Sequence, residues 1–207
     1  ATANSGIVFR RTDLDEPACK ELAESLDRAD RHLSARLDVS QESQWIEVAD
    51  TVRRECGRLD GLVNNAGIGS LATVEDETVE HWDAVMSVDS TGVWLGMKHL
   101  GPLIAASGGG SIVNLSSILG TVGGLGNSAA YHAAKGAVRT LTKNAALHWA
   151  EAGVRVNSLC RSSSASTTAR TPACSTGDTA MTSSPTRSRS GTCPARSSSP
   201  RPTGSAG

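Results

Sequence analysis

Short apolar runs along the chain alternate with longer segments whose apolar residues recur every three or four positions. The short runs have the length of strands and lie at residues 6–9, 33–39, 59–63, 111–115 and 154–159. The first predicted strand continues from this run and ends near Asp13. The longer segments predict helices, with apolar faces at Ala18, Leu22 and Leu26, then at Trp45, Val48, Val52 and Cys56, and further on within 76–107 and 128–152. Strands alternating with such helices predict a parallel sheet covered on both faces. We therefore expect an α/β fold with a doubly wound parallel sheet.

Local signals predict where these helices begin and end. Pro17 follows two acidic residues, and both features favour the first turn of a helix. Proline is tolerated there because the first N–H groups have no partner within the helix, and acidic side chains suit the positive end of the helix dipole. Gly57 predicts the end of the second helix. Gly92 and Pro102 predict interruptions in the long helical stretch, and a glycine-rich loop at 120–126 leads into the last helix.

The composition changes abruptly at about residue 160. Residues 161–207 contain 13 Ser, 9 Thr and six Arg, but no Leu, Ile, Val, Phe, Tyr or Trp. Such a segment cannot bury enough apolar surface to offset the entropy lost on ordering. We expect a folded domain over 1–160 and a disordered low-complexity tail over 161–207.

Charge and cysteine usage exclude several classes of protein. The net charge of −1 divides into +5 for the tail and −6 for the rest, so the folded part has no basic surface suited to nucleic acid. A tail that binds anions is the alternative to a solvated tail. Five scattered cysteines with no C-x-x-C pair argue against a disulfide framework and a metal site. We find no run of 18 apolar residues and no signal peptide, so we expect a cytoplasmic protein without a membrane segment.

Small and polar residues stand at three predicted strand ends, where open parallel sheets bind their ligands. These are Asn64-Asn65-Ala66-Gly67, Asn114-Leu115-Ser116-Ser117, and Asp38 with Val39 beside it. Small residues let a flat cofactor approach the backbone, and the amide and hydroxyl groups can form hydrogen bonds with it. Each motif taken alone is also compatible with an ordinary turn.

Tyr131 and Lys135 are four residues apart on the last predicted helix, so both lie on one helical face. An ammonium group near a phenol favours the phenolate, which makes proton transfer near neutral pH feasible. Many helices contain such a pair by chance, but Tyr131 is the single tyrosine of the chain and follows Ser117 by 14 residues.

The order and spacing of these motifs resemble those of the short-chain dehydrogenase/reductase family. The resemblance implies a Rossmann-like, doubly wound parallel sheet that is incomplete, without its first and last strands. It also implies a partial Rossmann-type domain over 1–160 that binds a dinucleotide and carries the catalytic residues. The resemblance runs from about residue 6 to residue 160 and includes Gly92-Val93-Trp94-Leu95-Gly96-Met97-Lys98 and Val154-Arg155-Val156-Asn157-Ser158. It implies that Tyr131 is the general acid/base, that Lys135 binds the nicotinamide ribose and favours the phenolate, and that Ser117 binds the substrate oxygen. It further implies that Asn64, Ala66 and Gly67 line the adenosine side of the cofactor cleft and that Asp38 and Val39 contact the adenine.

The sequence departs from the family pattern in four places. The family's glycine-rich phosphate loop is absent, and the chain resembles the family from its second strand onward, which would leave a gap beside the strand at 59–63. After Cys160 the tail replaces the family's usual continuation, through either a reading-frame shift or a native disordered segment. Asp89 stands where the family commonly has the Asn that supports a water-mediated proton path to the lysine. The spacing of 14 between Ser117 and Tyr131, where 13 is usual, leaves Ser116 as a second candidate.

The resemblance implies a cofactor, a reaction and an association state. Asp13 ends the first strand, where a carboxylate accepts hydrogen bonds from the ribose hydroxyls of NAD and repels the extra phosphate of NADP. We expect NAD, with NADP as the alternative because Arg10 and Arg11 lie close by. The implied reaction interconverts a secondary alcohol and a ketone, as alcohol and hydroxysteroid dehydrogenases do, or as ketoacyl reductases do. An inactive fragment or pseudoenzyme that acts through protein contacts is the alternative.

The family also forms dimers and tetramers through two long helices, which here would be those near 76–107 and 128–152. These helices carry Trp82, Trp94 and Trp149, and we expect a homo-oligomer. The alternative is that all three tryptophans point into the domain core.

Overall fold

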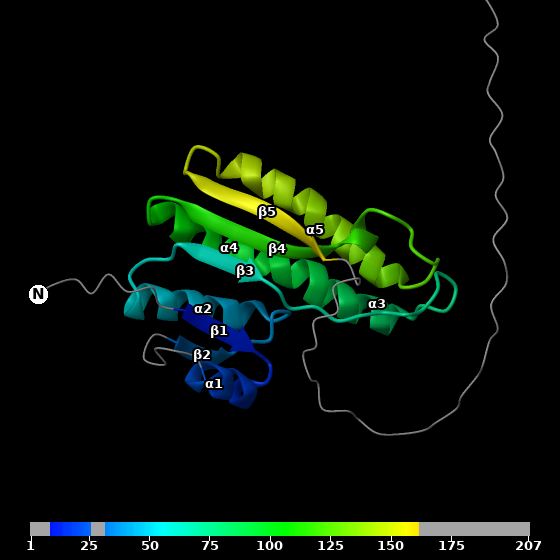
Figure 1. The fold of residues 1–207 in the computed structure, drawn as a ribbon, viewed down its shortest axis with the longest axis horizontal. Helices are drawn as coiled ribbons and strands as arrows, with labels where there is room; N and C mark the ends of the chain where they lie inside the picture. The colour runs from blue at the N-terminus through cyan, green and yellow to red at the C-terminus, as the bar shows by residue number, and fades with distance from the viewer. Residues whose placement is uncertain (1–8, 26–31, 162–207) are drawn as a thin grey trace, which may run out of the picture. The chain divides into compact units, whose positions relative to one another are not determined.

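The structure, a computed structural model, describes residues 9–25 and 32–161. Its elements are β1 (Phe9–Asp13), α1 (Glu16–Glu24), β2 (His32–Arg36), α2 (Glu42–Glu55), β3 (Gly61–Asn64), α3 (Val79–Met86), α4 (Gly92–Ala106), β4 (Gly110–Ser117), α5 (Ala129–His148) and β5 (Val154–Arg161) (Figure 1). Every paired strand runs parallel to its neighbour. The expected alternation of strands and helices is confirmed.

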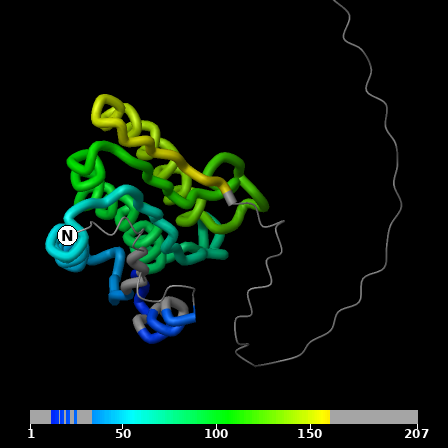
Figure 2. Tube along the Cα trace, turned by 60° about the vertical axis from the view of Figure 1, so that its left-hand side comes forward, coloured from blue at the N-terminus to red at the C-terminus, as the bar shows by residue number. Residues whose placement is uncertain are grey.

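Helices α4 and α5 cover one face of the sheet β3-β4-β5 (Figure 1). The core between them joins Met97 and Ile104 of α4, Ile112 and Val156 of the sheet, and Val138 of α5. Figure 2 shows β5 and α5 side by side, as expected for a strand that follows directly on its helix. This layer places α5, and with it Tyr131, along the sheet.

The opposite face of this sheet carries no helix in the part of the chain that the structure describes. Successive strand residues point to opposite faces, so the residues that alternate with the core side chains point away from α4 and α5. Val63 and Leu159 lie on this second face and are 63% and 57% exposed. Within the described residues, helices therefore cover one face of this sheet.

The described strands form two sheets rather than one. β1 pairs with β2, and β3 pairs with β4, but no described strand joins β1 to β3. This agrees with the gap expected beside the strand at 59–63. A parallel ladder is made by main-chain groups, which explains why β1 includes the polar residues up to Asp13. Residues 6–8 of the predicted strand lie outside the described residues.

Helix α2 packs on α4 through the apolar face that the sequence predicts. Trp45, Val48 and Val52 are buried against Leu95 and Leu100. The helix ends at its C-cap residue Cys56, and Gly57 follows with a φ of +70°, the left-handed conformation that commonly ends helices. Helix α1 likewise has Pro17 in its first turn, as predicted.

The long helical stretch is interrupted before Gly92, and Pro102 does not break it. Residues Ser87–Thr91 form a π-helical turn between α3 and α4. Pro102 lies inside α4, contrary to the expected interruption there. Tertiary packing on the sheet retains the helix, because neighbouring residues Gly101 and Ile104 are buried in the layer beside Pro102.

The three tryptophans of the predicted interface divide into two groups. Trp82 and Trp94 are 38% and 44% exposed, so they do not fill the domain core. Trp149 packs against the core of α4 and α5, with its ring over Gly101. The core alternative therefore holds for Trp149 alone.

The contact between Gly101 and Trp149 predicts a loss of stability on adding one methyl group. A Cβ at residue 101 would lie 2.3 Å from the Trp149 ring, so Gly101→Ala forces a packed ring to move. Overpacking of this kind costs about 1–3 kcal/mol. A urea unfolding curve should show a lower midpoint for this variant. Gly136→Ala on α5 is the matched control, since its Cβ meets one atom at 3.6 Å and Ala favours a helix. Equal midpoints for the two variants would contradict this prediction.

Candidate active site

Tyr131 and Lys135 lie one turn apart near the start of α5, as the four-residue spacing predicts. The Lys135 ammonium is 5.5 Å from the centre of the Tyr131 ring. Lys135 is 3% exposed, whereas Tyr131 is half-buried. The structure thus places a buried cation over the ring of the one phenol of the chain.

Asp89 pairs directly with Lys135 in the interior. Its Oδ2 lies 3.0 Å from the Lys135 Nζ, and the Asp89 side chain is fully buried. Among the described residues Oδ2 accepts no hydrogen bond of good geometry, so the ion pair with Lys135 is the contact that stabilises this oxygen. Lys135 also donates to the carbonyl oxygen of Leu115 at 3.0 Å. A buried charge left without its partner is costly, so the two side chains hold each other in place.

The π-helical turn carries Asp89 to this position. A π turn inserts an extra residue into a helix and is common at functional sites. The other carboxylate oxygen, Oδ1, accepts a hydrogen bond from the Ile68 N–H at 2.7 Å. Asp89 therefore links α5 to the segment that follows β3. The sequence pointed to Asp89, but it contained no sign of the direct ion pair.

Gly67 stands against the same pair of charges. A Cβ added there would lie 2.9 Å from Asp89 Oδ2 and 3.4 Å from Lys135 Nζ. Residues 65–67 are exposed just beyond the end of β3. The absence of a side chain at Gly67 keeps the backbone close to the ion pair and open to a ligand.

The two serines at the end of β4 have different partners. Ser116 is buried and donates its hydroxyl to the carbonyl oxygen of Lys135 at 2.9 Å. Ser117 accepts at Oγ from the Leu119 N–H at 3.2 Å, at the start of a short 3₁₀ turn. Ser116 thus ties β4 to α5, which leaves Ser117 as the candidate for a substrate contact.

Asn64 lies within the sheet layer instead of at its surface. Its amide donates to Asn114 Oδ1 at 2.8 Å, and Asn114 donates in turn to Thr142 Oγ1 at 2.9 Å on α5. All three side chains are buried. Hydrogen bonding to one another satisfies these groups, and the chain of amides fastens β3, β4 and α5 together.

The remaining candidates stand at the ends of β1 and β2. Asp13 is exposed, and Asp15 rather than Asp13 caps α1 by accepting from the Ala18 N–H at 3.0 Å. Asp38 is half-buried and accepts from the Ser40 hydroxyl at 2.7 Å. Val39 is half-buried and packs against Gly92. The side chains of Arg10 and Arg11, and the basic tail, lie outside the residues described in side-chain detail.

A hollow of about 540 Å³ lies away from these residues, between α3 and the start of α5. Val79 and Trp82 line it on one side and His132 on the other, while Ser117, Tyr131 and Lys135 do not line it. Glu77 at its edge is a polar residue that the sequence motifs did not include. Its signal, an acid four residues before His81, is common on helices and does not by itself indicate a function.

Comparisons with known proteins identify proteins that this chain resembles. The sequence profile of the enoyl-(acyl carrier protein) reductase family matches residues 1–189. A cyclopentanol dehydrogenase of Comamonas sp. (strain NCIMB 9872) is 45% identical over 123 residues, which cover 59% of this chain and 49% of that protein. A 3-alpha-(or 20-beta)-hydroxysteroid dehydrogenase of Mycobacterium tuberculosis (strain ATCC 25618 / H37Rv) is 42% identical over 146 residues, covering 70% of this chain and 55% of that protein.

The crystal structure of a short-chain dehydrogenase from Streptomyces avermitilis superposes on this fold. Its TM-score is 0.69 at 28% sequence identity, and the match covers 74% of this chain and 56% of that one. The chain thus spans about half the length of the proteins that it matches. The profile match and the shared fold cover the residues of the candidate site, and the chain belongs to the short-chain dehydrogenase/reductase family.

Proposed function

We propose that this protein is an NAD(P)-dependent oxidoreductase that interconverts a secondary alcohol and a ketone. The observation that carries the proposal is the pairing of Tyr131 with the buried Lys135 ammonium, 5.5 Å from its ring, at the start of α5. Relatives named as cyclopentanol and hydroxysteroid dehydrogenases favour an alcohol or hydroxysteroid substrate over the substrate of a ketoacyl reductase.

The residues beyond β3 fit a nicotinamide dinucleotide. The exposed Ala66 and Gly67 leave backbone accessible next to Lys135, and a side chain at residue 67 would fill this space. In the proposal Lys135 binds the nicotinamide ribose. Ala66 and Gly67 line the adenosine side of the cofactor, and the buried Asn64 lies behind them. Asp38 and Val39 face the adenine. The bound cofactor would supply or accept the hydride.

The side chains of the protein supply the proton and the orientation. Ser117 donates a hydrogen bond to the substrate oxygen and holds it near Tyr131. Tyr131 then gives a proton to that oxygen in reduction, or takes one from it in oxidation. Lys135 stabilises the negative charge that the phenol acquires on giving up its proton, and Asp89 holds Lys135 in position.

We propose NAD as the preferred cofactor. Asp13 is exposed at the end of β1, where its carboxylate would accept from ribose hydroxyls and repel an added phosphate. The purified chain should therefore enhance NADH fluorescence saturably, and half-saturation should need less NADH than NADPH. It should also oxidise cyclopentanol or a steroid alcohol with NAD. Tighter binding of NADPH would contradict the assignment to Asp13.

A second candidate is a pseudoenzyme or inactive fragment that acts through protein contacts. Among the described residues no strand joins β1 to β3, and the nucleotide would lie across the ends of these strands. A titration in which NADH fluorescence does not change at millimolar cofactor would support this candidate and exclude the dehydrogenase.

We also propose a homo-oligomer in which α3, α4 and α5 pair with a second copy. The exposed Trp82 and Trp94 lie on α3 and α4, and an exposed apolar surface of this kind commonly marks an interface. Light scattering at micromolar concentration should give a multiple of the 21.3 kDa chain mass. Two further expectations, that the protein binds no membrane and that it lies in the cytoplasm, remain predictions. No described helix is long and apolar enough to cross a bilayer.

A further inference from the structure

Helix α5 begins without a capping side chain of its own. Its N-cap residue, Ser128, has the left-handed φ of +63° and makes no side-chain hydrogen bond to the helix. A residue other than glycine adopts this conformation at a cost, so surrounding contacts must hold it. The first N–H groups of any helix also need acceptors from outside the helix.

The segment before α3 supplies those acceptors. The Ala129 N–H donates to the Ala72 carbonyl at 3.2 Å, and the Ala130 N–H donates to Glu77 Oε2 at 3.3 Å. Thr73 and Asn127 form a single antiparallel bridge between the same two stretches. A carboxylate at this place also suits the positive end of the helix dipole. The first turn of α5 is thus capped from a distant part of the chain.

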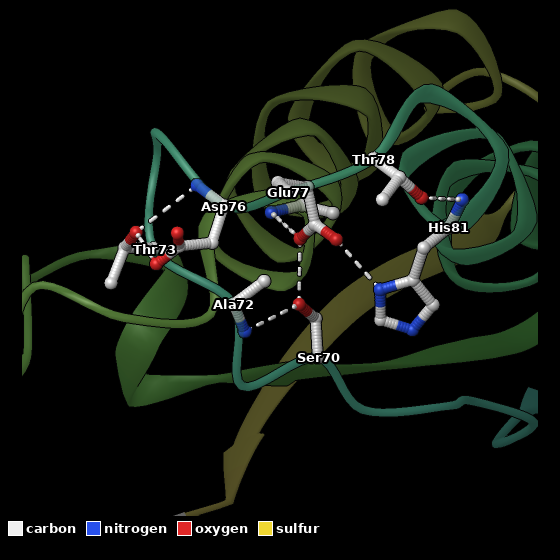
Figure 3. Close-up of polar contacts among 8 residues, drawn as sticks. Ser70, Ala72, Thr73, Asp76, Glu77, Thr78 and His81 are labelled. Atoms are coloured by element: carbon white, nitrogen blue, oxygen red, sulfur yellow. Dashed lines mark hydrogen bonds and ion pairs between the residues drawn. The ribbon is translucent and has the colours of Figure 1, made fainter.

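Glu77 connects three segments at this point (Figure 3). Its Oε2 accepts from the Ser70 hydroxyl at 2.6 Å, and its Oε1 lies 2.6 Å from His81 Nδ1 on α3. The Glu77 side chain is 5% exposed. The Ser70 hydroxyl also accepts from the Ala72 N–H at 3.3 Å, which closes the network.

The network places Glu77 one residue from the proposed proton donor. Ala130, which donates to Glu77, directly precedes Tyr131. Lys135 lies a turn further on and is held separately by Asp89 and the Leu115 carbonyl. Glu77 therefore acts on the phenol end of the site and leaves the lysine end to other contacts.

We propose that Glu77 is a positioning residue that fixes the first turn of α5, and with it the Tyr131 ring, through the Ala130 N–H. This rests on the proposed function for its effect on turnover, but the anchoring of the helix can be measured without any reaction. Misplacement of a catalytic group by about 1 Å can cost 10²-fold in rate.

Removing the cap tests the proposal directly. In Glu77→Ala, the Ala130 amide should exchange its hydrogen about tenfold faster, measured by NMR on the full chain without cofactor. The ring resonances of Tyr131, which are unique because the chain has one tyrosine, should shift. We expect kcat to fall about 10- to 100-fold while the NADH affinity changes less than about twofold.

Matched variants separate positioning from simple loss of stability. Glu77→Gln should restore kcat to within about threefold, because its oxygen can still accept from Ser70 and Ala130 while its amide faces His81. Glu75→Gln, an exposed acid two residues away, should behave as the unchanged chain. Should Glu77→Ala fail to fold, Ser70→Ala removes one contact of the network and should produce smaller changes in the same direction.

Three results would overturn the proposal. Unchanged exchange at Ala130 would show that Glu77 does not hold the helix. Faster exchange with unchanged Tyr131 resonances would show that the anchor does not reach the phenol. A lower melting temperature with unchanged kcat in the folded fraction would leave Glu77 with a structural role alone. Shifted resonances in a chain without any turnover would retain the anchor and reject the proposed enzyme instead.

The charge of Glu77 gives the network a defined pH range. The hydrogen bond from Ser70, followed by those from His81 and Ala130, holds the pKa of Glu77 below its ordinary value, against the opposing effect of burial. A lowered pKa means that its contribution to stability is present above the ordinary glutamate range and is lost as the pH falls through the lowered value. His81 on α3 contacts Glu77 directly, and Asp76 beside it and His132 on α5 are further titratable groups of this region.

Discussion

Tyr131→Phe is expected to abolish turnover and to leave NADH binding intact. The substitution removes the phenolic hydroxyl, the proposed proton donor, while the half-buried ring keeps its packing beside the Lys135 ammonium. General acid–base groups contribute about 10²–10⁴-fold to rate, so kcat should fall by at least this range. Stopped assays of alcohol oxidation, with NADH fluorescence titrated on the same preparation, separate the two effects.

The binding measurement serves as the internal control for this variant. A Phe variant that binds NADH normally but does not turn over confirms the proton-transfer role. A variant that retains most of its activity would show that another group moves the proton, and the assignment of Tyr131 would have to be abandoned.

Lys135→Met is expected to reduce NADH affinity, rate and stability together. The change removes the proposed ribose contact and the cation beside Tyr131. It also leaves the Asp89 carboxylate buried without its partner at 3.0 Å. Breaking a buried ion pair by removing one member costs about 3–5 kcal/mol, a large part of the stability of a typical domain. Urea unfolding, NADH titration and turnover measure the three losses.

A second substitution separates the chemical role of Lys135 from its structural role. Asp89→Asn added to Lys135→Met removes the unpaired charge, and its amide oxygen can still accept from the Ile68 N–H. The double variant should recover most of the lost stability but not the turnover. Lys143→Met, at an exposed site on the same helix, is the matched control and should change little. Recovery of turnover in the double variant would rule out a chemical role for Lys135, and a normal NADH affinity would remove the ribose contact.

The two sets of variants address neighbouring turns near the start of one helix. Glu77 holds the first turn of α5 from the loop before α3, whereas Asp89 holds Lys135 from the π-helical turn after it. Both anchors come from the stretch between β3 and α4. Changes in that stretch are therefore expected to affect the chemistry at α5 without touching Tyr131 or Lys135.

Local periodicity determines much of the architecture of this protein. Helical spacing places Tyr131 and Lys135 on one face, because residues four apart on a helix are neighbours wherever the helix lies. The apolar face of α2 at Trp45, Val48 and Val52 and its end at Gly57 follow from the same local rules. The alternation of strands and helices likewise predicts a parallel sheet, since parallel strands need crossover connections.

Tertiary contacts decided what each polar residue does. Asn64 and Gly67 belong to one sequence motif, yet Asn64 is buried against Asn114 while Gly67 is exposed beside the ion pair. Ser116 and Ser117 are adjacent, but alternation along β4 and the approach of α5 give them different partners. Strand alternation separates the two faces, but it does not identify the partners of Asn64 and Ser116, because Asn114 and Lys135 come from segments far away in the sequence.

The same limit applies to the residues that hold the candidate site together. Nothing local to Asp89 predicts an ion pair across 46 positions, and nothing local to Glu77 predicts a hydrogen bond to α5 across 53 positions. Pro102 remained helical because the layer on the sheet outweighs its local preference. The sequence by itself identified the groups that carry the proposed chemistry, and the packing of β3, α3 and α4 against α5 decided which side chains hold those groups in place.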